Sequence, residues 1–160
     1  NVVGIRQNIW DRYRNVLGIF VRRGLDHQPL LVFGDGSQQR AFSSVEYLLA
    51  PLARLTNQGD SQIYNLGSDR PVTILRLAEL VQASLATRGI DVEIQHVEAR
   101  HEVKDAFSSH EKAINDLNFH DETDLTLTID QVIAWAITEP TREIKSLDYE
   151  VTRKLYSYWT

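Results

Sequence analysis

A short apolar run that ends in a glycine-rich turn is the feature that most constrains the fold of this chain. Residues 30–33 read Leu-Leu-Val-Phe, and residues 34–36 read Gly-Asp-Gly. An apolar run of this length, bounded by a turn signal, is typical of a buried strand. Beyond the turn lies Arg40, at the entry to a second apolar segment. The stretch therefore predicts a strand, a tight turn and a guanidinium close behind it.

Apolar periodicity predicts helices and strands in alternation along the chain. We expect helices over residues 10–25, 45–55, 74–88, 110–117 and 129–139, strands over residues 30–33, 63–66 and 92–97, and a last amphipathic segment over residues 144–159. Because strands and helices mix, the fold class is α/β or mixed α+β.

Capping residues set the expected helix boundaries. The predicted N-caps are Thr73, Ser108 or Ser109, and Thr128 with Gln131 in a capping-box spacing. Gly24, Gly89 and Pro140 are expected to lie at helix ends, whereas Pro51 should kink or divide its helix. The helix over residues 45–55 is apolar on most faces, so we expect it to be largely buried.

Composition narrows the class of protein. The chain has 160 residues, a formal net charge of −5 and no cysteine. We expect a main unit over residues 1–140 with a helical tail over residues 141–160, located in the cytoplasm, with no nucleic-acid or membrane partner. Cysteine chemistry is excluded, and no histidine stands in a metal-binding spacing, so we assign no metal. Methionine is absent even at position 1, which suggests a truncated or processed product.

Three segments in order resemble one family. These segments are Asn1 to Gln7, Leu31 to Phe42 and Ile63 to Ser68. They resemble the N-V-Y-G-P-R-Q, G-D-G-x-Q-x-R-D-F and Y-N-L-G motifs in the C-terminal half of extended short-chain dehydrogenases/reductases, the NAD-dependent sugar-nucleotide epimerases and dehydratases. The resemblance implies a partial substrate-binding lobe that lacks the N-terminal Rossmann half.

The resemblance also implies a site for a nucleotide-diphosphate sugar. Arg40 matches the arginine that holds the diphosphate, and Arg100 and Glu102 match an arginine that clamps it and an acid that takes a ribose hydroxyl. Ala41 replaces the acid that follows the family arginine, so the ion pair that orients Arg40 is expected to be lost. The remaining matched positions, for the sugar, the base and the wall beside it, are Asn1, Asn15, Val16, Leu31 and Phe33.

Each of these assignments has a simpler alternative. A Gly-Asp-Gly triplet is usually only a tight turn. Arg100 and Glu102 also fit a solvated loop with a local charge pair, which stabilises little. Leu31 and Phe33 also fit the core, and we expect at least one of them to lie there.

Two features of a complete enzyme of this family are absent from the sequence. It holds no G-x-x-G-x-x-G run, and no tyrosine has a lysine four residues later; Tyr149 has Arg153. We therefore expect no catalytic residue and no cofactor bound by this chain alone, although the family uses NAD. Two functions stay open: a sugar-nucleotide-binding lobe completed by a separate nucleotide-binding chain, or a non-catalytic binding or assembly module. In either case we expect a homo-oligomer or a partner chain.

We predict that the isolated 160-residue chain does not bind NAD and has no epimerase, dehydratase or oxidoreductase activity, because the dinucleotide fingerprint and the Tyr-Lys pair are missing. Calorimetric titration with NAD checks this. Saturable binding to one site at micromolar concentration would contradict it.

Overall fold

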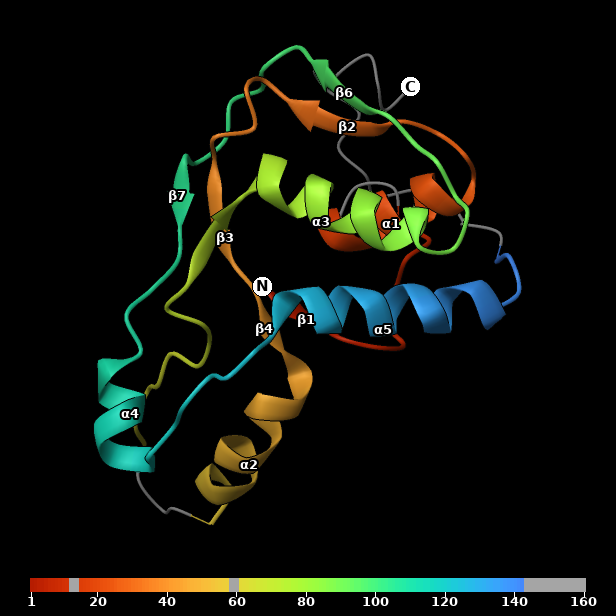
Figure 1. Ribbon diagram of the computed structural model, residues 1–160. Helices are drawn as coiled ribbons and strands as arrows, with labels where there is room; N and C mark the ends of the chain where they lie inside the picture. Colours follow the sequence, from red (N-terminus) through yellow and green to blue (C-terminus); the bar gives the residue numbers. More distant parts are fainter. Residues whose placement is uncertain (12–14, 58–60, 143–160) are drawn as a thin grey trace, which may run out of the picture.

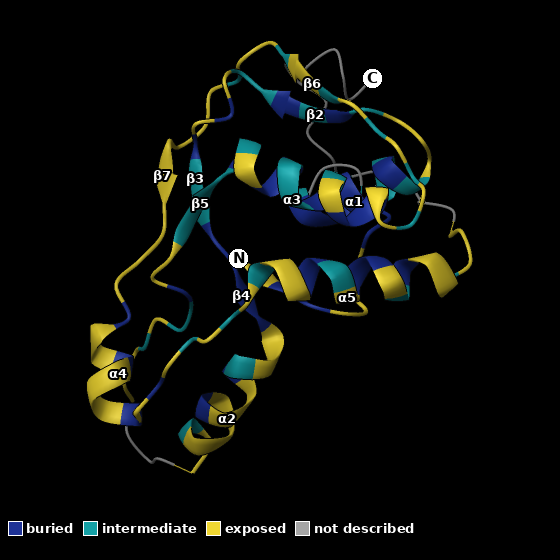
Figure 2. Cartoon of the chain, in the orientation of Figure 1, coloured by how far each residue is buried: buried dark blue, intermediate teal, exposed yellow. Residues whose placement is uncertain are grey.

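The computed structural model describes residues 1–11, 15–57 and 61–142. Its main body stacks a two-stranded parallel sheet on helices (Figure 1). The strands are β2 (Leu30–Phe33) and β6 (Ile94–Val97), and the helices are α1 (Val16–Leu25), α3 (Ile74–Ala86) and α5 (Leu125–Thr138). Their facing sides form the larger hydrophobic cluster (Figure 2), which also takes in Ile9 and Trp10.

The strand and turn predicted at residues 30–36 are present. Leu30 and Val32 are fully buried, while the alternate positions are half-buried. Gly34 and Gly36 have φ angles of 65° and 74°, in the left-handed region that favours glycine. At Gly36 a Cβ atom would lie 2.6 Å from a methyl carbon of Val32, so only glycine fits the turn.

The turn leads into a second, three-stranded sheet. Its central strand β3 (Gln39–Ala41) pairs antiparallel with β5 (Pro71–Thr73) and parallel with β7 (Asp105–Ala106). The parallel register sets Arg40 opposite Ala106. Because β7 pairs with β3, the chain after residue 97 runs alongside the Gly34–Gly36 turn, and residues near 100 come close to residues near 40.

The rest of the described chain forms a smaller unit. Here β1 (Val2–Val3) pairs with β4 (Ser43–Ser44), and α2 (Val45–Leu55) packs near α4 (Glu111–Leu117). The prediction that α2 is largely buried is wrong. Leu48 and Pro51 are buried, but Leu49 is 58% and Leu52 is 50% exposed. Much of α2 is coloured as exposed in Figure 2. Pro51 does not divide the helix.

Several predicted element boundaries are confirmed. Thr73 caps α3 through a 3.1 Å hydrogen bond from the Arg76 amide, and Gly89 follows the end of that helix with a φ of 73°. The strand predicted at 92–97 begins at Ile94, and α5 ends before Pro140.

Two helix starts differ from the prediction. The helix predicted from residue 10 begins at Val16, because Asn15 adopts a left-handed φ of 66° and accepts a hydrogen bond from the Gly18 amide. The predicted capping box at Thr128 is wrong, because Asp124 caps α5 and the Thr128 hydroxyl instead donates to the Asp124 carbonyl.

Two further helix boundaries involve side-chain contacts. Gly24 lies one residue before the end of α1 at Leu25, as predicted, and a Cβ atom there would clash with Leu85. At α4 the capping position is His110, although the Ser109 hydroxyl does accept from the Glu111 amide.

The predicted strand at 63–66 is absent from the described residues. Ile63 is 85% exposed, and its carbonyl accepts a 3.1 Å hydrogen bond from the Lys112 ammonium group. No strand among the described residues pairs with this segment, so it runs in irregular backbone. The predicted tail over residues 144–159 lies outside the described residues. Within them, no helix has the length and apolar character needed to cross a membrane.

One ion pair joins the turn that follows α3 to α5. The Arg88 guanidinium lies 2.6 Å from the Asp130 carboxylate, which also accepts a 2.9 Å hydrogen bond from the Ser84 hydroxyl. The hydrogen bonds from Arg88 and then Ser84 hold the pKa of Asp130 below its ordinary value. A lowered carboxyl pKa stabilises the fold above the unfolded-state pKa, and this contribution is lost as pH falls through the folded-state pKa.

We predict that Asp130→Asn lowers the free energy of unfolding at neutral pH by up to about 1 kcal/mol, a limit set by the half-exposed carboxylate. The difference from wild type should vanish in acid, where Asp130 is protonated. Urea unfolding at neutral and acidic pH measures it, with Glu79→Gln, in the exposed Arg76–Glu79 pair, as the control. A deficit that is equal at both pH values would contradict the assignment.

Candidate functional site

A cavity of about 420 Å³ opens between α1, β2, β3 and the loop that follows β6. This volume lies in the range typical of sites for small molecules. All of the residues matched from the sequence line it: Asn1, Asn15, Val16, Leu31, Phe33, Arg40, Arg100 and Glu102. The fold therefore gathers into one place residues that are up to a hundred positions apart.

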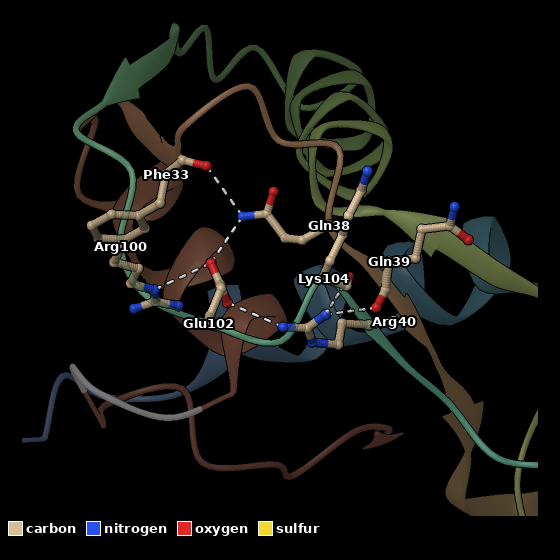
Figure 3. Close-up of polar contacts among 7 residues, drawn as sticks. All are labelled: Phe33, Gln38, Gln39, Arg40, Arg100, Glu102 and Lys104. Carbon is tan, nitrogen blue, oxygen red and sulfur yellow. Dashed lines mark hydrogen bonds and ion pairs between the residues drawn. The ribbon is translucent and has the colours of Figure 1, made fainter.

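The charged centre of the cavity is a carboxylate between two guanidinium groups (Figure 3). One oxygen of Glu102 lies 3.1 Å from Nη2 of Arg40, and the other lies 3.3 Å from Nε of Arg100. With formal charges the three groups sum to +1. The side chains keep 16–27% of their surface exposed, so solvent reaches the cluster only in part.

Backbone carbonyls fix the Arg40 side chain from the other side. Its Nη1 donates to the carbonyls of Gln39, at 2.7 Å, and Lys104, at 3.1 Å (Figure 3). We expected the orienting ion pair to be lost because Ala41 replaces an acid, and this expectation is wrong. Glu102, distant in sequence, supplies that ion pair.

Arg100 lies over an aromatic ring. Its guanidinium carbon is 4.3 Å from the centroid of the Phe33 ring, a distance typical of a cation–π contact (Figure 3). Its Nε meanwhile bonds Glu102. Arg100 is thus held by both a ring and a carboxylate, and its assignment to a ligand stays a prediction beside the simpler alternative of a local charge pair.

The wall of the cavity corrects one prediction about β2. We expected at least one of Leu31 and Phe33 to lie in the core, but both line the cavity, while Leu30 and Val32 fill the core. Residues two apart in a strand point to the same face, so the pair had to share one environment.

The two asparagines are held by the fold. The Asn1 side chain and its backbone amino group donate to the Ala41 carbonyl, at 3.0 and 2.9 Å. Both polar atoms of the Asn15 side chain are bonded. Its oxygen accepts from the Gly18 amide and caps α1, and its nitrogen donates to the Gln7 side chain at 3.1 Å. Asn15 therefore has a structural role at the cavity rim, and Val16 beside it adds apolar wall.

Sequence reasoning missed Gln38, which lines the same cavity and is only 9% exposed. Its amide donates to Glu102 at 3.0 Å and to the Phe33 carbonyl at 3.1 Å. The signal was in the matched motif itself, because the glutamine of G-D-G-x-Q-x-R falls at position 38.

Comparisons with known proteins find relatives that, by their names, act on nucleotide sugars. No family model matches the chain. Over 88 residues it is 36% identical to UDP-glucuronic acid decarboxylase 1 of Danio rerio, a match that covers 55% of this chain and 21% of that protein. UDP-glucuronic acid decarboxylase 4 of Arabidopsis thaliana is 38% identical over 85 residues, which cover 53% of this chain and 19% of the relative.

Solved structures extend the match to most of the described fold. The UDP-glucose 4-epimerase of Thermotoga maritima, solved with UDP-glucose, superposes with a TM-score of 0.76 at 24% identity, covering 86% of this chain and 43% of that one. Pal from Bacillus thuringiensis gives a TM-score of 0.73 at 27% identity over the same shares. The chain resembles the C-terminal part of an extended short-chain dehydrogenase/reductase. It spans about a fifth of the curated relatives it matches and less than half of the solved ones.

Proposed function

We propose that this chain forms the nucleotide-sugar-binding part of an NAD-dependent epimerase/dehydratase-like protein. The observation that carries the proposal is the Arg40–Glu102–Arg100 cluster at the cavity. A diphosphate diester carries two negative charges, and a pair of guanidinium forks is well suited to bind it. Support also comes from the relatives, whose names refer to UDP sugars.

The charge balance favours an anion even though a carboxylate lies between the arginines. Glu102 cancels one of two positive charges, so the cluster keeps a net +1 for the ligand. A carboxylate has about four acceptor positions. Three described side chains donate to Glu102, which leaves capacity for a hydroxyl of the ligand.

The apolar side of the cavity favours a ligand that carries a ring beside its anionic group. Val16, Leu31 and Phe33 offer a wall against which a base or sugar ring can lie. Arg100 stands where this wall meets the charged cluster. A ligand that is anionic at one point and ring-shaped beside it satisfies both surfaces, and a nucleotide-diphosphate sugar has this form.

The described residues do not fit the dinucleotide itself. In a dinucleotide-binding fingerprint the glycine turn leads from a strand into a helix, whose N-terminus receives the pyrophosphate. Here the Gly34–Gly36 turn leads from β2 into β3. We therefore assign this chain the binding of substrate, and assign cofactor and catalytic base to a nucleotide-binding part that completes the site.

We predict that UDP-glucose binds this chain and that Arg40→Ala weakens binding tenfold or more. A charge-assisted hydrogen bond contributes about 1.5–3 kcal/mol, and each 1.4 kcal/mol is about tenfold in Kd. Calorimetric titration measures it, with Arg76→Ala, in the exposed pair on α3, as the matched control.

The possible results separate the two open functions. If the wild type binds no UDP-, GDP-, dTDP- or CDP-sugar, the non-catalytic assembly module is favoured instead. If the wild type binds and Arg40→Ala binds equally well, the ligand lies elsewhere.

A second part of the proposal is that the chain associates. Val45, Leu49 and Leu52 form an exposed apolar stripe on α2, next to the edge of the short β1–β4 sheet. Exposed stripes and open strand edges favour association with another chain. The partner is a second copy of this chain or the nucleotide-binding part.

We predict that the isolated chain scatters light as an oligomer at low micromolar concentration, because this stripe is covered on association. The double variant Leu49→Lys, Leu52→Lys should be a monomer of 18.3 kDa. Leu127→Lys, at an exposed position on α5, is the control and should leave the oligomer intact. A monodisperse wild-type monomer would refute the association.

A further inference from the structure

Gln38 is a nearly buried amide that connects both supports of the arginine cluster. It is 9% exposed, and its Nε2 donates to Glu102 Oε1 at 3.0 Å and to the Phe33 carbonyl at 3.1 Å (Figure 3). Both protons of its amide group are thereby used. A buried amide satisfied in this way holds its partners firmly, because losing either bond leaves a buried polar group without a partner.

The two partners of Gln38 are the groups that hold Arg100. Glu102 Oε1, which accepts from Gln38, also accepts from Arg100 Nε. The Phe33 residue whose carbonyl accepts from Gln38 places its ring beneath the Arg100 guanidinium. The second oxygen of Glu102 meets Arg40. One amide therefore sets the carboxylate from which both guanidinium groups take their orientation.

We propose that Gln38 is a positioning residue that acts through Glu102 to fix the two guanidinium groups for a diphosphate. This inference rests on the proposed function. A neutral amide is the side chain that performs this task without changing the charge. It donates to the carboxylate and leaves the net +1 of Arg40, Arg100 and Glu102 intact, whereas a carboxylate at position 38 would cancel it.

The first experiment needs no ligand. In ¹H–¹⁵N spectra of the full chain, Gln38→Leu should move the Arg100 Nε–H signal and speed its exchange with solvent, because Glu102 loses its anchor. The Arg22 Nε–H, bonded to Asp26 at 2.7 Å, is the internal control and should not move. Gln82→Leu is the matched variant, because it removes a part-buried hydrogen bond from the Gln82 amide to the Val92 carbonyl, and neither residue lines the cavity. An unchanged Arg100 signal in Gln38→Leu overturns the proposal.

The second experiment uses UDP-glucose, whose diphosphate is esterified at both ends and keeps its charge between acid and neutral pH. Gln38→Leu should bind about tenfold more weakly, and Gln82→Leu as wild type. The isosteric Gln38→Glu keeps the shape of the side chain, so it tests the proposal even if the leucine variant does not fold. In Gln38→Glu the new carboxyl group lies against that of Glu102, and the pair takes up a proton more readily in acid. The affinity of this variant for UDP-glucose should therefore be low at about pH 8 and recover at about pH 5.

The outcomes separate this inference from the proposed function. If wild type and variants all fail to bind UDP-glucose, but the Arg100 signal moves only in Gln38→Leu, the proposed function fails and the positioning of the arginines by Gln38 stands. If wild type binds and both leucine variants lose affinity equally, or if Gln38→Glu shows no dependence on pH, Gln38 has a general structural role and the proposal is wrong.

Discussion

The parallel pairing of two distant segments is the constraint on which the rest of the structure depends. Residues 30–41 and 94–106 run side by side twice, first as β2 with β6 and again as β3 with β7. Between the two pairings both segments leave the sheet, the first through the Gly34–Gly36 turn and the second through the loop that bears Arg100. The cavity is lined by residues on both sides of this interruption, from Leu31 and Phe33 in β2 to Arg40 in β3, so the gap between the two sheets positions the site.

Burial in the hydrophobic core stabilises the strand from which the glycine turn starts. Leu30 and Val32 are buried against the helices, and their burial secures the strand that ends at the turn. The charged cluster, by contrast, is a weak source of stability, because taking ions partly out of water costs about as much as their attraction returns. Its carboxylate lies within 3.3 Å of both guanidinium groups at the cavity, so their arrangement contributes to the shape of the site more than to the stability of the fold.

Sequence reasoning succeeded where the signal is local. The strand at 30–33, the glycine turn, the Thr73 cap and the Gly89 terminus depend on a few neighbouring residues, and each was predicted. It failed where the partner is distant. Nothing near Arg40 shows that Glu102 replaces the acid missing at Ala41, and nothing near Ile63 shows that its carbonyl is taken by Lys112 rather than by a neighbouring strand.

The two hydrophobic clusters divide the molecule into a part that shapes the site and a part that presents a surface. The cavity wall comes from α1 and β2, which belong to the larger cluster, and from β3 and the loop after β6. The smaller cluster, around Leu48 and Phe119, supports α2 and leaves the outer side of that helix open. The units meet at β1 and β4, where Asn1 bonds to the Ala41 carbonyl, directly after Arg40. The hydrogen bond of Asn1 thus ties the β1–β4 sheet, from which α2 starts, to the strand that carries Arg40.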